Sequence, residues 1–140
     1  MIQVNNQQFE ALINEAMEEL PKAYVERLDN VAITYEDEPN AEQRKRLKLR
    51  CYQSLYGLYE GVPRTERGAG YNLVLPDKIT LFKLPIEHSA HSMAELKEQV
   101  KNTLWHEIAH HYGLGHARIH ELERKMHKIK HNKPPENTKN

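Results

Sequence analysis

The stretch that decides the fold runs from His106 to His116 and reads His-Glu-Ile-Ala-His-His-Tyr-Gly-Leu-Gly-His. Residues four apart lie on one face of an α-helix, so a helix here brings the imidazoles of His106 and His110 together. Glu107 lies about 100° further round the helix, within reach of a water held by the same ion. The stretch therefore predicts a metal site with a carboxylate beside it.

A glycine follows these two histidines and predicts where the helix ends. Gly113 can adopt a positive φ without steric cost, so the chain can turn back there and bring in His116 as a third ligand. Three protein ligands leave one coordination position open, which distinguishes a catalytic zinc site from a closed structural one. We expect Zn²⁺ bound by His106, His110 and His116, with Glu107 as the general base.

The length of this motif makes it specific. The chain contains nine histidines, so the short pattern H-E-x-x-H arises easily by chance, whereas H-E-x-x-H-x-x-G-x-x-H is far rarer. The competing interpretation is a histidine-rich helix whose imidazoles bind only water and backbone groups. The full pattern favours the metal site.

Length and charge restrict the class of protein. The 140 residues suffice for one modest core, and 20 basic residues balance 20 acidic ones. We therefore expect no nucleic-acid partner, and no apolar run reaches the roughly 18 residues that span a membrane. Residues 1–131 are predicted to form a single domain, followed by a disordered polar tail at 132–140.

Cysteine content and the first residues bear on location. Cys51 is the only cysteine, so no intrachain disulfide can form, which fits a reducing compartment. The first eight residues have neither the basic start nor the apolar core of a signal peptide. We expect a cytoplasmic protein.

Periodic apolar residues predict three main helices, over 7–20, from Ser92 through the motif, and over 117–130. In the second of these, Leu104 belongs to the buried stripe, so His106 and His110 fall on the opposite face. His111 falls toward the packed side, and we expect it to support the site from the core rather than bind the metal.

Runs of β-branched and aromatic residues predict three strands, at 31–35, 55–60 and 78–84. The last is expected to be central. The second is expected to be an edge strand, antiparallel to its neighbour, with extended substrate adding alongside and Gly57 admitting a close backbone approach.

Five basic residues fall within seven positions: Arg44, Lys45, Arg46, Lys48 and Arg50. They are interpreted either as the solvated face of a helix or as a contact for RNA, and the scarcity of aromatic residues among them favours the first. The second would suit a metal-dependent endoribonuclease, against which the zero net charge and Glu107 both argue.

Beyond the motif, several segments carry a family resemblance: Leu20-Pro21, Asn30–Ile33, Glu36–Pro39, Gly57–Pro63, Leu75–Leu81 and His106–His111. Through them roughly residues 9–116 resemble the small bacterial zincin-like metallopeptidases. The resemblance implies an α+β fold of minimal zincin type, with a small mixed β-sheet packed on helices that include the active-site helix. It also implies a peptide or protein substrate, and so a zinc-dependent peptidase.

The chain departs from this family at the third ligand position, which usually carries Asp but here is His116, as in metzincins. Met126 lies on a predicted helix, so it is not assigned to the methionine turn of metzincins. Tyr59, Tyr71 and Tyr112 remain candidates for stabilising the oxyanion. A metal-binding or interaction module without turnover remains an alternative, because so short a chain has little room for walls around a substrate.

Overall fold

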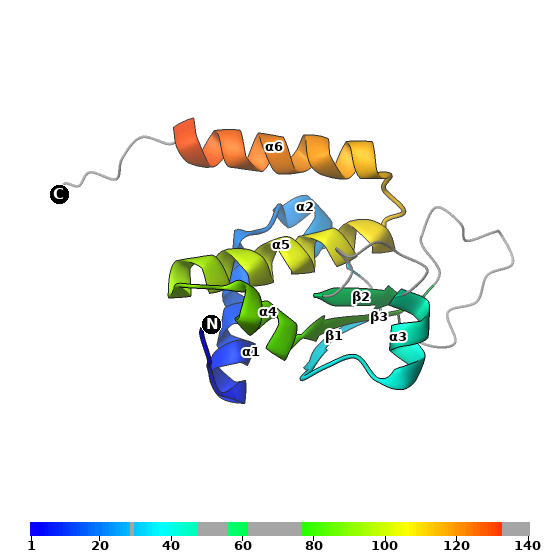
Figure 1. Cartoon of the computed structure of the whole chain (residues 1–140). Coiled ribbons are helices and arrows are strands. Elements are labelled where there is room, and N and C mark those ends of the chain that lie inside the picture. Colours follow the sequence, from blue (N-terminus) through cyan, green and yellow to red (C-terminus); the bar gives the residue numbers. More distant parts are fainter. Residues whose placement is uncertain (29, 48–55, 62–76, 133–140) are drawn as a thin grey trace, which may run out of the picture.

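The computed structural model describes residues 1–28, 30–47, 56–61 and 77–132, of which the side chains of 46, 47, 116 and 126–132 are not described (Figure 1). Along the chain the elements are α1 (Asn6–Glu19), α2 (Lys22–Val25), β1 (Val31–Glu36), α3 (Ala41–Leu47), β2 (Gly57–Glu60), β3 (Asp77–Phe82), α4 (Lys83–Ser89), α5 (Met93–His111) and α6 (His116–Asn132).

The three described strands form one mixed sheet in the order β1-β3-β2. Strand β1 runs parallel to β3, with Ile33 opposite Ile79, and β2 runs antiparallel to β3, with Tyr59 opposite the same residue. The predicted central strand and the predicted antiparallel edge strand are therefore both confirmed among the described strands. The predicted start of the edge strand, at residue 55, lies outside the described residues.

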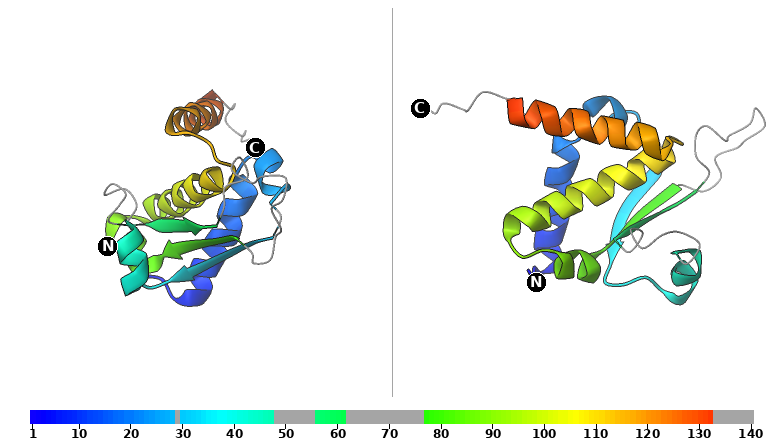
Figure 2. Two further views of the ribbon diagram at one scale, coloured as in Figure 1. Left: turned by 90° about the vertical axis from the view of Figure 1, so that its right-hand side faces the viewer. Right: turned by 45° about the horizontal axis from the view of Figure 1, so that its top comes forward.

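The core lies between the sheet and helices α1 and α5, and Figure 2 shows these two helices crossing beside the strands. Helix α1 begins with a capping box, in which Asn5 and Gln8 each accept a hydrogen bond from the other's backbone N–H. The predicted stripe of α5 is fully buried, as are its sheet partners: Leu96, Val100, Leu104, Ile108, Ile79 and Leu81. The α+β class expected from the sequence is confirmed.

The sequence prediction fails after Phe82, where it extends the strand to Leu84. In the structure β3 ends at Phe82, and Lys83 begins helix α4. Pro85 occupies the first turn of α4, where its missing N–H removes no helical hydrogen bond. Lys83 and Glu87 then form a buried ion pair along this helix, at 3.4 Å.

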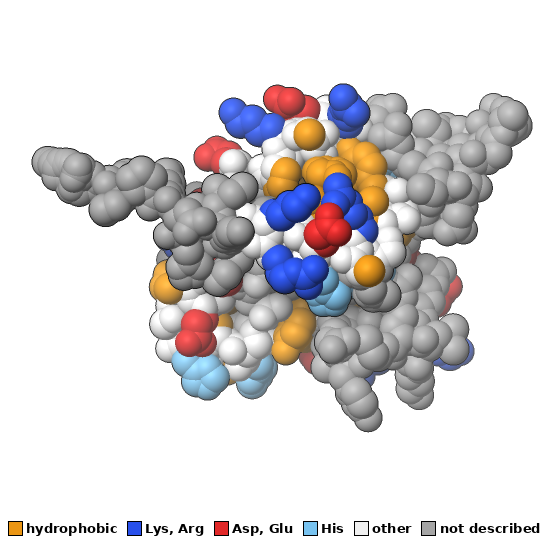
Figure 3. Space-filling model, turned by 90° about the horizontal axis from the view of Figure 1, so that it is seen from above, with side chains coloured by type: hydrophobic (Ala, Val, Ile, Leu, Met, Phe, Trp, Pro, Cys, Tyr) orange, Lys and Arg blue, Asp and Glu red, His pale blue; other side chains and the backbone are white. Residues whose placement is uncertain are grey.

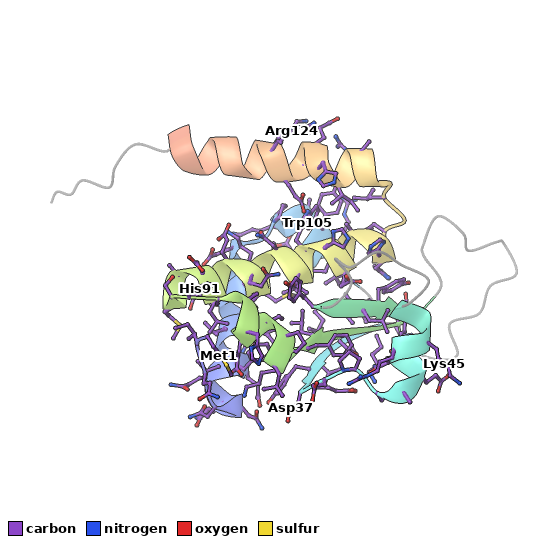
Figure 4. All side chains as sticks on the ribbon, viewed as in Figure 1. Met1, Asp37, Lys45, His91, Trp105 and Arg124 are labelled. Atoms are coloured by element: carbon purple, nitrogen blue, oxygen red, sulfur yellow. The ribbon has the colours of Figure 1, made fainter. Side chains whose placement is uncertain are left out.

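Helix α6 lies on the side of α5 that faces away from the sheet (Figure 1). In this helix Ile119 is completely buried, whereas Arg118 and Lys125 are exposed and both pair with Glu121. Seen from above, this side of the molecule carries charged side chains of both signs (Figure 3). On α5, Trp105, labelled in Figure 4, packs edge-on against Tyr24 of α2 with ring centroids 5.3 Å apart.

Two sequence predictions concern segments that lie partly outside the described residues. Helix α6 continues to Asn132, the first residue of the tail predicted at 132–140, and residues 133–140 lie outside the described part. In the basic run, Arg44 and Lys45 are exposed on α3, as a solvated helix face predicts, and Arg44 pairs with Glu38 at 3.8 Å. Among the described helices, none has the length and apolar character needed to cross a bilayer.

Candidate metal centre

The last two turns of α5 carry the candidate site. His106 and His110 are half-buried, and Glu107 is only 4% exposed. One ligand atom from each of the three lies within 4.8 Å of the others, and the two imidazole centroids are 4.7 Å apart with nearly perpendicular rings. The side chains that the i, i+4 spacing predicts to share a face therefore do meet.

Helix α5 ends immediately after these residues, where Gly113 has a φ of 74°. The Gly113 N–H donates to the carbonyl of His110 at 2.9 Å, and the Leu114 N–H donates to that of Ala109 at 3.1 Å. This pair of hydrogen bonds is the Schellman motif, in which a left-handed residue satisfies the last carbonyls of a helix. The predicted helix break at the glycine is confirmed, and its backbone geometry explains why glycine stands there.

The third predicted ligand, His116, is the first residue of α6. Its side chain lies outside the described residues, so its role as a ligand remains a prediction. The chain turns at Gly113 and starts a new helix three positions later. One tight turn therefore separates His116 from His106 and His110, the two proposed ligands in α5.

The surroundings of Glu107 differ from the prediction that the chemistry lies on the face opposite the core. A Cβ atom added to Gly57 of β2 would lie 3.3 Å from Cγ of Glu107 and 2.7 Å from Cγ2 of Thr103. Strand β2 therefore covers Glu107, because position 57 has no side chain to hold the strand away from α5. The sequence predicts that substrate approaches the backbone closely at Gly57. On the side of β2 that faces α5, the close approach is made by α5 instead.

A buried cluster that the sequence analysis did not single out lies beside the site. Oδ2 of Asp77 accepts a hydrogen bond from the Tyr59 hydroxyl at 2.7 Å and lies 2.8 Å from Nδ1 of His111. All three side chains are at most 5% exposed. His111 faces the core as predicted, but Asp77 follows a proline at a strand start, where an acidic residue normally indicates an exposed turn.

Two of the three tyrosines considered for the oxyanion donate hydrogen bonds within the fold. The hydroxyl of Tyr59 donates to Asp77 inside the core, and that of Tyr112 donates to the backbone carbonyl of Tyr24 at 2.5 Å. Both hydroxyls thus hold elements of the fold together, and the residue that stabilises the oxyanion stays an open prediction. Tyr71 lies outside the described residues.

The donor set fits zinc. Zinc binds imidazole nitrogen and carboxylate oxygen in sites of low coordination number, and catalytic sites use three protein ligands. Two half-buried imidazoles whose donor atoms come within 4.8 Å of a neighbouring carboxylate provide most of such a set. The close packing of Glu107 against β2 leaves the two histidines as the outward-facing donors of this group.

Comparison with known proteins gives one clear result. A family model described as zincin-like metallopeptidase matches residues 28–126, a span that includes the three strands and every residue of the candidate site. No curated protein matches the chain. Because the match covers well over half of the 140 residues, the chain belongs to the zincin-like metallopeptidase family.

Proposed function

We propose that the protein is a zinc-dependent peptidase that holds its metal through His106, His110 and His116. The observation that carries this proposal is the convergence of His106, Glu107 and His110, with ligand atoms within 4.8 Å of one another beside a helix break. Membership of the zincin-like family supports a peptidase-type function and a metal. The spacing from Gly113 to His116 supports the third ligand.

Zinc, when bound, polarises the carbonyl of a peptide bond and lowers the pKa of a water to about 7. Glu107 acts as the general base, because its carboxylate can accept a proton from the attacking water and return it to the leaving amine. The close packing of Gly57 against its side chain restricts where that carboxylate can point. A base held in one place loses less entropy when the reaction begins.

The substrate is proposed to lie along β2 as an extended peptide. Among the described strands β2 pairs with β3 alone, which leaves its outer edge facing away from the sheet. A strand edge presents backbone donors and acceptors that another extended chain can pair with. Since Gly57 of this strand contacts Glu107, a peptide bound along the edge would pass close to the proposed base.

The decisive experiment compares zinc-loaded wild type with Glu107→Gln on a mixed peptide library read by mass spectrometry, with and without a chelator. The variant keeps the size of the side chain but removes the base, so cleavage should fall by roughly 10²–10⁴-fold while zinc content is unchanged. Equal cleavage by both proteins would overturn the role of Glu107. If wild type cleaves no peptide, a metal-binding module becomes the better account.

A further inference from the structure

The Asp77 cluster connects the three elements that surround the candidate site. Asp77 is the first residue of β3, Tyr59 belongs to β2 and His111 is the last residue of α5. One oxygen of Asp77 receives both contacts, at 2.7 and 2.8 Å, and the rings of Tyr59 and His111 meet edge-on at 5.7 Å. The C-terminal turn of α5 is therefore attached by a polar contact to the first residue of the central strand.

Packing also fixes the carboxylate of Asp77. A Cβ atom added to Gly61 would lie 2.4 Å from Oδ1, so the chain after β2 lies directly against the second carboxylate oxygen. A carboxylate oxygen accepts hydrogen bonds, so Nδ1 of His111 carries the proton in this contact. Hydrogen bonds to a charged acceptor are about twice as strong as neutral ones, and a polar group this deeply buried requires hydrogen-bond partners.

The contact matters for the metal because of where it lies on α5. His111 directly follows His110, and adjacent side chains point about 100° apart around the helix axis. A rotation of the helix end that lengthens the bond from His111 to Asp77 must therefore also move the imidazole of His110. Metal ligands need to be held within about 0.5 Å of the productive geometry.

We propose that Asp77 and His111 are positioning residues for the metal site, which fix the orientation of His110 without binding the ion themselves. This inference rests on the zinc site of the proposed function. It predicts that breaking the bond between α5 and β3 weakens zinc binding even in a folded protein. A merely structural bond would lower stability and leave the zinc affinity unchanged.

The chain provides two matched controls. Tyr59→Phe removes the other hydrogen bond to the same oxygen of Asp77 but leaves α5 attached to β3. Glu87→Gln disturbs a second buried carboxylate, which accepts the Val4 N–H at 2.8 Å and pairs with Lys83 at 3.4 Å in α4. Both variants lose buried polar interactions, but neither breaks the contact between His111 and Asp77.

The test uses the full chain and His111→Phe, which keeps a buried ring but has no group to donate to Asp77. Zinc dissociation constants are measured by competition with a chromophoric chelator, under conditions where circular dichroism shows each protein folded. His111→Phe should bind zinc about tenfold more weakly, the lower end of the effect of losing a group that orients a ligand. Tyr59→Phe and Glu87→Gln should stay within about twofold of wild type. The visible spectrum of bound Co²⁺ should change only in His111→Phe.

An unchanged zinc affinity in folded His111→Phe would overturn the inference, as would an equal loss in Glu87→Gln. If His111→Phe does not fold, Asp77→Asn decides, because it replaces a charge-assisted hydrogen bond by a weaker neutral one. Asp77→Asn must then also weaken zinc binding, and no change overturns the inference. Failure of the proposed zinc site is distinguishable, since His106→Ala would then bind zinc as well as wild type does.

Discussion

Gly57 of the edge strand lies directly against Glu107 of α5: a Cβ atom at position 57 would be 3.3 Å from Cγ of Glu107. The strand proposed to bind substrate and the residue proposed to move the proton are therefore in contact. A carboxylate that packs against the substrate strand cannot move independently of it. The geometry of the proposed reaction thus depends on a position that has no side chain.

Replacing Gly57 by Ala should lower kcat about tenfold to a hundredfold and leave the zinc content unchanged. The added methyl group would lie 2.7 Å from Cγ2 of Thr103, so α5 and β2 must move apart and Glu107 with them. Overpacking of this kind also costs roughly 1–3 kcal/mol of stability. Steady-state kinetics on a peptide identified from the library, together with metal analysis, check the prediction.

The matched control is Gly115→Ala, because a Cβ atom there would meet nothing within 4 Å. This variant should keep its kcat. A Gly57→Ala protein with wild-type kcat would show that Glu107 does not depend on the close packing of β2.

Replacing Gly113 by Ala should destabilise the protein by about 1–2 kcal/mol, since a residue with a Cβ is strained at a φ of 74°. Asn tolerates this left-handed conformation better, so Gly113→Asn should recover part of the loss. Denaturant unfolding of the metal-free proteins measures both changes. Equal stabilities for Ala and Asn would contradict a conformational cause.

His116→Ala should bind much less zinc than wild type, because it removes one of three proposed ligands. His120→Ala is the matched control: His120 is exposed on the same helix and lies 3.3 Å from Glu123 in a surface pair. The control should bind zinc normally. If His116→Ala retains full affinity, another group completes the site, and the chain's departure from the family's usual Asp at this position has no bearing on the metal.

Features that depend on neighbours in the sequence could be predicted. The spacing of His106 and His110, the helix break at Gly113 and the apolar stripe around Leu104 all follow from helical periodicity and the conformational freedom of glycine. Their positions in the structure agree with the prediction. The central position of β3 is also predicted correctly.

Features that depend on contacts between distant segments could not be predicted from the sequence. Asp77 and His111 are separated by 34 positions, and nothing beside either residue indicates that they form a buried pair. The burial of Glu107 likewise results from a strand that lies about fifty residues earlier, where Gly57 removes the obstacle to close packing. Local patterns predict which face a residue occupies, but not what will cover that face.

The different roles proposed for the two histidines, as metal ligands, and for Glu107, as general base, should be visible in the stability of the protein as well as in its activity. Zinc bound to the native state would raise the free energy of unfolding, by about 2.7 kcal/mol when free zinc is a hundredfold above its dissociation constant. His106→Ala and His110→Ala should lose most of this zinc-dependent rise, because each removes an imidazole from the group whose donor atoms lie within 4.8 Å. Glu107→Gln should keep it, since its proposed role is proton transfer. Thermal unfolding with and without zinc tests all three variants, and loss of the zinc effect in Glu107→Gln would identify that carboxylate as a ligand instead of a base.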